Sequence, residues 1–248
     1  MRLKQHLLAS ALCVLPVAAS AADLPMKAPP MRMVQPMPFT WTGFYVGGSA
    51  GFISQNSQGT DLGGPTSGTG GLIGLAGDQY GISGIGGIFG VNVGYNWQFD
   101  PHWVLGIEAD IAGATLNNSG NGFSGFSNSE VTSKLSALGT VRGRIGYAFD
   151  RALVYATGGL AYGNVHNRAS FQQEAIYTVD QYSWKTGWTV GGGLEYAFMN
   201  NWTVRVEGLY VDLGTTTLNA PGSGPTSGCN FGFKNRYALG RIGLNYKF

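Results

Sequence analysis

Charged residues two positions apart recur along the chain. The pairs are Glu108 with Asp110, Arg142 with Arg144, and Arg205 with Glu207. In an extended strand, residues i and i+2 point to the same side. Each pair would therefore present both of its charged groups on one face. If that face is enclosed, the charges must pair with one another, because an uncompensated buried charge costs several kcal/mol. The pattern predicts a network of salt bridges.

Catalytic chemistry has weaker candidates. Nucleophilic or acid–base catalysis places a histidine beside a serine or a carboxylate, and the only loose candidate triad is His166 with Ser170 and Glu174. Such proximity arises easily in a segment rich in Ser and Glu. The chain has no Gly-x-x-x-x-Gly-Lys loop, no Gly-x-Ser-x-Gly elbow and no Cys-x-x-Cys pair. We expect no enzyme, no cofactor and no metal site, and a structurally incidental Cys229.

Composition points to a membrane protein without spanning helices. Charged residues make up 11% of the 248 residues, whereas soluble domains carry about 25%. Beyond the N-terminus no apolar run of about 20 residues exists, so a membrane-spanning helix is not expected there. Arg2 and Lys4 account for the net charge of +2, which leaves 13 basic and 13 acidic residues from Asp23 onward. That balance argues against a nucleic-acid partner.

The N-terminal segment has the pattern of a secretory signal. Arg2 and Lys4 precede an apolar stretch over residues 7–19, and small residues follow through Ala22. We therefore expect a signal peptide over residues 1–22, cleaved after Ala21 or Ala22. Residues 23–40, rich in Pro and Met, are expected to form an extended periplasmic lead-in, because proline interrupts backbone ladders. Residues 41–248 would form the folded domain.

Alternation with period two dominates that domain. Over residues 89–99, large apolar residues occupy one face and Gly, Asn and Gln occupy the other. This is the pattern of a strand with lipid outside and a polar interior. The strands expected in this way span 43–54, 89–99, 103–112, 131–149, 153–163, 183–198, 202–213 and 231–248.

The expected connections alternate in length. Three are only three residues long, at 100–102, 150–152 and 199–201. The other four, at 55–83, 113–130, 164–182 and 214–230, are long and polar. This asymmetry is typical of outer-membrane barrels, and a soluble β-sandwich gives no reason for it. The predicted fold is all-β: an eight-stranded antiparallel transmembrane β-barrel with four long extracellular loops and three short periplasmic turns.

Following the inward parity collects the charged residues in one lumen. They are Glu108, Asp110, Arg142, Arg144, Glu195, Arg205, Glu207 and Arg241. An eight-stranded barrel is just wide enough for its own side chains to fill it, so we expect the charges to form a plug. A narrow ion pathway is the alternative, because glycines at inward positions would leave room for water. These glycines are Gly90, Gly94, Gly106, Gly146, Gly191 and Gly243.

Several longer motifs resemble one known family. They lie at 41–48 (Trp-Thr-Gly-Phe-Tyr-Val-Gly-Gly), 140–147, 155–163, 191–196 and 210–214. Together they are similar to the small alphaproteobacterial outer-membrane barrels known as outer-membrane immunogenic or porin-family proteins, which have an opacity-like barrel domain. The resemblance implies an eight-stranded barrel in the bacterial outer membrane with surface-exposed loops. Tyr246 and Phe248 resemble the C-terminal signal read by the barrel-assembly machinery.

Three functions follow as expectations. The first is a structural, surface-exposed envelope component. The second is a narrow porin-like channel for ions or small solutes, and the third is a lipid-active enzyme. The expected partners are outer-membrane lipids and lipopolysaccharide, with the assembly machinery during biogenesis. The sequence does not identify what the loops bind.

Overall fold

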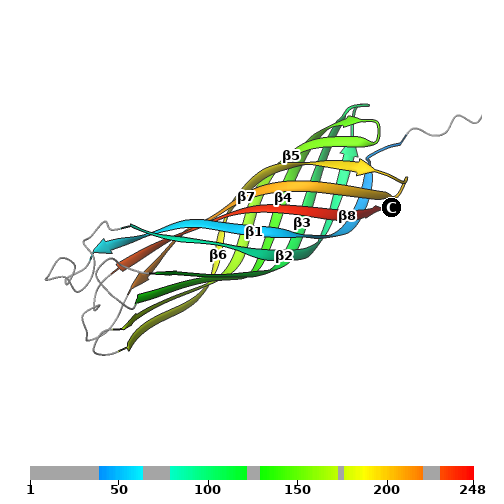
Figure 1. Cartoon of the computed structure of the whole chain (residues 1–248). Helices are drawn as coiled ribbons and strands as arrows, with labels where there is room; N and C mark the ends of the chain where they lie inside the picture. Colours follow the sequence, from blue (N-terminus) through cyan, green and yellow to red (C-terminus); the bar gives the residue numbers. More distant parts are fainter. Residues whose placement is uncertain (1–38, 64–78, 122–128, 173–175, 220–229) are drawn as a thin grey trace, which may run out of the picture. The chain divides into compact units, whose positions relative to one another are not determined.

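The computed structural model describes residues 39–63, 79–121, 129–172, 176–219 and 230–248. Eight strands follow one another in a closed antiparallel barrel in the order β1 to β8, as predicted (Figure 1). The strands are β1 (Gly43–Gly63), β2 (Gln79–Gln98), β3 (Trp103–Asn121), β4 (Ser129–Phe149), β5 (Ala152–Gln172), β6 (Ile176–Ala197), β7 (Trp202–Asn219) and β8 (Asn230–Lys247). The described residues include no helix long and apolar enough to cross a membrane.

The predicted inside–outside alternation is confirmed. Phe89, Val91 and Val93 on β2 are exposed, whereas Asn92 between them is 5% exposed. On β5, Leu160 is 69% exposed and Ala161 is 1% exposed, which confirms the phase expected for this strand. The outward side chains therefore form an apolar band around the barrel. Aromatic residues border it at Phe44, Phe99, Trp103, Phe149, Phe198, Trp202 and Phe248 on one side, and at Tyr162, Trp184, Trp188 and Tyr210 on the other.

The predicted loop boundaries are wrong. The strands contain 18 to 22 residues, about twice the 9–11 needed to cross a bilayer. Of the expected loop 164–182, only residues 173–175 lie outside β5 and β6. The sequence of these outer strand ends is rich in Gly, Ser, Asn and Thr, so it resembles a loop although cross-strand pairing continues. Glu174 and Cys229 lie outside the described residues.

The barrel ladder is not continuous along the whole length of these strands. Pairing between β6 and β7 ends at Trp188 with Asp212, and pairing between β2 and β3 ends at Ile88 with Ala114. Register shifts in β3–β4 and β7–β8 lie at the same level, and such bulges bend the strands away from their neighbours. Unpaired backbone groups are not tolerated in hydrocarbon. The hydrocarbon region therefore ends near this level.

Candidate functional site: a charged and closed lumen

All eight predicted charged residues point into the barrel. The least buried of them, Asp110, is 7% exposed. Each takes part in at least one ion pair with another member of the set. The predicted salt-bridge network therefore exists, and it contains four arginines and four carboxylates. We refer to these eight residues as the charged layer.

Arg142 is at the centre of the charged layer. Its guanidinium donates to Glu108 and to Glu207, and its Nη2 lies 3.0 Å from Oδ2 of Asp110. Arg241 lies beside it, with Nη2 at 3.1 Å from Asp110 Oδ2 and 3.2 Å from Glu207 Oε2. Two arginines and three carboxylates thus share one buried volume, so removing one member leaves several charges uncompensated.

Glu108 connects this centre to the rest of the charged layer. Its Oε2 accepts from Nη1 of Arg205 at 2.5 Å and from the hydroxyl of Tyr45 at 2.7 Å. Arg144 donates to the same hydroxyl at 3.2 Å, and its guanidinium lies 4.5 Å from the centre of the Tyr155 ring. Tyr45 and Tyr155 were not among the predicted site residues, although both occupy inward positions of the strand pattern.

Arg144 forms its main ion pair with Glu195. Arg144 Nη2 lies 2.8 Å from Glu195 Oε2, while Oε1 of Glu195 accepts from Thr203 at 2.5 Å and from Asn245 at 2.9 Å. Every oxygen of this carboxylate is therefore occupied.

Glycines lie opposite most of the charged layer. Six members of the charged layer lie directly opposite a glycine on the next strand: Glu108 with Gly94, Arg142 with Gly159, Arg144 with Gly106, Arg205 with Gly243, Glu207 with Gly193 and Arg241 with Gly51. A Cβ at Gly94 would lie 2.3 Å from the Tyr45 hydroxyl, and one at Gly243 would lie 2.9 Å from Nε of Arg205. Of the inward glycines expected to leave room for water, Gly94, Gly106 and Gly243 are therefore filled by neighbouring side chains instead.

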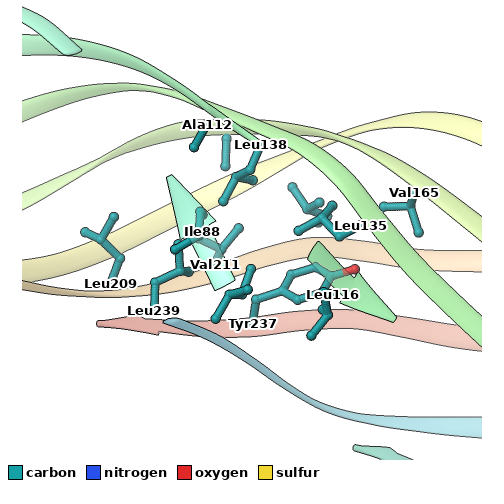
Figure 2. Close-up of a cluster of buried hydrophobic side chains, with 13 residues drawn as sticks. Ile88, Ala112, Leu116, Leu135, Leu138, Val165, Leu209, Val211, Tyr237 and Leu239 are labelled. Atoms are coloured by element: carbon teal, nitrogen blue, oxygen red, sulfur yellow. The ribbon is translucent and has the colours of Figure 1, made fainter. Parts of the chain in front are cut away.

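An apolar layer covers the charged layer on the side of the long strand ends. Thirteen buried residues form it, including Leu138, Leu209, Val211 and Leu239. Figure 2 shows their side chains projecting from several strands into one cluster. β7 contributes to both layers in turn. Its charged Arg205 and Glu207 are followed along the strand by the apolar Leu209, Val211 and Leu213. The sequence analysis did not anticipate this layer.

A second apolar layer closes the periplasmic end. It contains Trp41, Val104, Ala148, Leu153, Tyr155 and Ala197, with Phe39 packed against it. Trp41 is 1% exposed, and its indole donates to the backbone oxygen of Asp150 at 3.1 Å. Its backbone N–H donates to the side chain of Gln98 at 2.8 Å. The residues just before β1 thus close the periplasmic opening of the barrel, and we refer to them as the stopper. Phe39 packs on Trp41 and Thr40 hydrogen-bonds to Gln98 of β2, although both residues were expected in the lead-in.

Replacing Trp41 with Ala is expected to destabilise the barrel without opening it. Large aromatic-to-alanine changes in packed interiors cost about 3–5 kcal/mol, while the charged layer above still blocks the lumen. Urea unfolding in lipid vesicles, followed by the shift in gel mobility, would measure the loss. Trp97→Ala is the matched control, because Trp97 is 56% exposed on the outer face. Equal losses in the two variants would contradict the stopper.

The other sequence candidates are not assembled into a site. His166 lies in β5, not in a loop, and its ring stacks on Tyr182 at 3.9 Å between centroids. The side chains of Ser170 and Glu174 lie outside what the structure describes. His102 stacks on Tyr147 in a short turn. In the described part of the chain, no group of three or more His, Cys, Asp or Glu residues could hold a metal ion.

A closed barrel with an apolar outer band, aromatic borders and a polar interior defines an outer-membrane β-barrel protein. The chain belongs to the family described as "Outer membrane protein beta-barrel domain", which it matches over residues 8–248. It is 38% identical to the 31 kDa outer-membrane immunogenic protein of Brucella melitensis, over 99% of this chain and 100% of that protein. It is also 34% identical to the 22 kDa outer membrane protein of Rhizobium leguminosarum, over 70% of this chain and 64% of that protein. These relatives confirm the resemblance seen in the motifs and the location in the outer membrane.

Among solved structures, the chain is similar to the outer membrane protein OprG from Pseudomonas aeruginosa. The TM-score is 0.51 at 11% identity, with 84% of this chain and 96% of that chain covered. At this identity the likeness supports the fold alone.

Proposed function

We propose that the protein is a structural, surface-exposed component of the outer membrane with a closed lumen. The observation that carries this proposal is the stack of three layers inside the barrel: Trp41 and its neighbours, the charged layer, and the apolar layer of Figure 2. Side chains from all eight strands contribute to these layers. A barrel filled in this way stabilises the envelope and presents its outer strand ends and loops to the surroundings.

A deletion strain separates this role from that of a channel. A structural component predicts that loss of the protein increases entry of an apolar fluorescent dye and sensitivity to detergent. A diffusion channel predicts slower uptake of small hydrophilic solutes, with the dye barrier unchanged. Complementation with the wild-type chain is the control. Slower solute uptake with an intact dye barrier would contradict the proposed function.

A narrow channel and an enzyme are less well supported. The channel depends on free space next to inward glycines, and the spaces at Gly94, Gly106 and Gly243 are taken by neighbouring side chains. For an enzyme, the candidate base His166 lies within β5 and its ring stacks on Tyr182. The names of the curated relatives describe immunogenic outer-membrane proteins and not a reaction. The proposal is therefore a protein without catalytic activity.

The assembly machinery is the proposed partner during biogenesis, through Tyr246 and Phe248. Tyr246 packs against Trp202 and against Phe248, whose own ring is 71% exposed. Replacing Phe248 with Ser is expected to lower the folded fraction in cells several-fold, while refolding from urea into detergent is retained. The gel-mobility shift before boiling measures both. Equal loss in the cell and in detergent would assign Phe248 to stability and not to recognition by the machinery.

A further inference from the structure

A row of hydrogen-bond donors crosses four strands on the outer face. Backbone pairing aligns Asn117 of β3 with Lys134 of β4, Lys134 with His166 of β5, and His166 with Tyr182 of β6. Neighbouring strands lie about 4.8 Å apart, so residues that carry an amide, an ammonium group, an imidazole and a phenol follow one another on adjacent strands. Asn117, Lys134 and Tyr182 are exposed, and His166 is half-buried against the Tyr182 ring. We refer to these four residues as the donor row.

The donor row lies just outside the hydrocarbon region. On β5, His166 follows Tyr162 of the outer aromatic border by four residues, or about 13 Å at 3.3 Å per residue. Arg168, also exposed, is the next outward position on the same strand. This is the depth at which the headgroups of outer-leaflet lipids lie. Positively charged side chains near a membrane surface attract anionic lipids by about 1 kcal/mol each.

An apolar groove on the lipid-facing surface ends at Tyr162. It has a volume of about 820 Å³ and is lined by outward residues that include Gly48, Val91, Ala109, Ile111 and Tyr162. Gly48 pairs with Val91, Ile111 pairs with Gly139, and Gly139 pairs with Tyr162. The groove therefore crosses successive strands and rises obliquely through the apolar band. Its size and apolar lining suit an acyl chain, which the membrane itself supplies.

We propose that the donor row and this groove together bind one lipopolysaccharide molecule of the outer leaflet. Lys134 and His166 contact an anionic group of the lipid A headgroup, Asn117 and Tyr182 donate to its remaining oxygens, and an acyl chain descends past Tyr162 into the groove. The proposal goes beyond the structural role and depends only on the location in the outer membrane. Lys134 is the principal cation of the donor row, whose other members carry an amide, an imidazole and a phenol.

Native mass spectrometry of protein purified from outer membranes and titrated with diphosphoryl lipid A in detergent tests the headgroup contacts. Lys134→Gln should weaken binding about tenfold or more, the expected effect of losing one charge-assisted hydrogen bond. The matched control is Lys234→Gln, which removes another exposed lysine, from β8, and should leave the affinity unchanged. Equal losses in the two variants would show general charge attraction and overturn the proposal.

Two further arms test the lipid as the occupant. Gly48→Leu should fill the groove and weaken lipid A binding several-fold without disturbing the barrel, because a Cβ there meets only one atom, at 3.8 Å. Gly208→Leu on β7 is its control, with a nearest atom at 3.9 Å and no place in the groove. Unchanged affinity in Gly48→Leu would contradict the acyl-chain site. Displacement of lipid A by equimolar inorganic phosphate would show that the donor row binds simple anions and would contradict a specific site for the lipid.

Discussion

Replacing Arg142 with Ala is expected to cost about 3–5 kcal/mol in the free energy of unfolding, the range observed when one partner of a buried ion pair is removed. Arg142 contacts Glu108, Asp110 and Glu207, and its side chain is 1% exposed. Its loss leaves three buried carboxylates with one positive charge too few. Arg241 and Arg205 still contact them but cannot neutralise all of them, since Glu195 already engages Arg144.

Arg236→Ala provides the comparison for this prediction. Arg236 also pairs with a carboxylate, at 2.9 Å from Asp212, but its side chain is 47% exposed. Exposed pairs contribute about 0–1 kcal/mol. Urea titrations in lipid vesicles, followed by gel mobility, would give both free energies. Similar small losses in the two variants would mean that water enters the lumen and screens the charged layer.

Replacing Gly159 with Val should prevent the barrel from folding. Gly159 faces Arg142 across β4 and β5, and an added Cβ would lie 2.1 Å from the backbone oxygen of Val141 and 2.7 Å from Cα of Arg142. Backbone atoms cannot move aside as a flexible side chain can, so the two strands would have to separate. We expect almost none of the heat-shifted folded band after refolding into detergent.

Gly143→Val is the control, because it adds the same side chain on the neighbouring strand. Gly143 faces outward, and a Cβ there finds its nearest atom at 4.0 Å. This variant should refold as the wild type does. If Gly159→Val also refolded normally, the close packing of glycine against the charged layer would be wrong.

The barrel and its charged layer follow from the sequence because period-two alternation assigns each residue to one face. Because Ile107 on β3 and Val141 on β4 point outward, their neighbours Glu108 and Arg142 must point inward. Eight strands then leave one narrow lumen in which the charges meet. Their partners could not be assigned in this way, because pairing across the lumen depends on strand stagger and side-chain length. Neither quantity appears in an alternation pattern.

Two features escaped the sequence analysis for physical reasons. Polar residues such as Asn117 and Asn164 continue a strand above the membrane but have the composition of a loop, so the strand ends were placed too early. Trp41 lies just before β1, where strand periodicity gives no direction for its side chain. The outer apolar layer had a readable signal, because Leu209, Val211 and Leu213 continue the inward parity of Arg205 and Glu207.

Single-channel conductance of the refolded protein in planar bilayers tests the central claim of a closed lumen most directly. Folding would be confirmed first by gel mobility before boiling, and the Arg142→Ala/Arg144→Ala variant would be measured beside the wild type. We expect silent bilayers for the wild type and, because both apolar layers remain, little conductance for the variant despite its lower stability. Steady, reproducible conductance steps from the folded wild-type protein would contradict the closed lumen. A large increase in the variant alone would show that the charged layer is a gate.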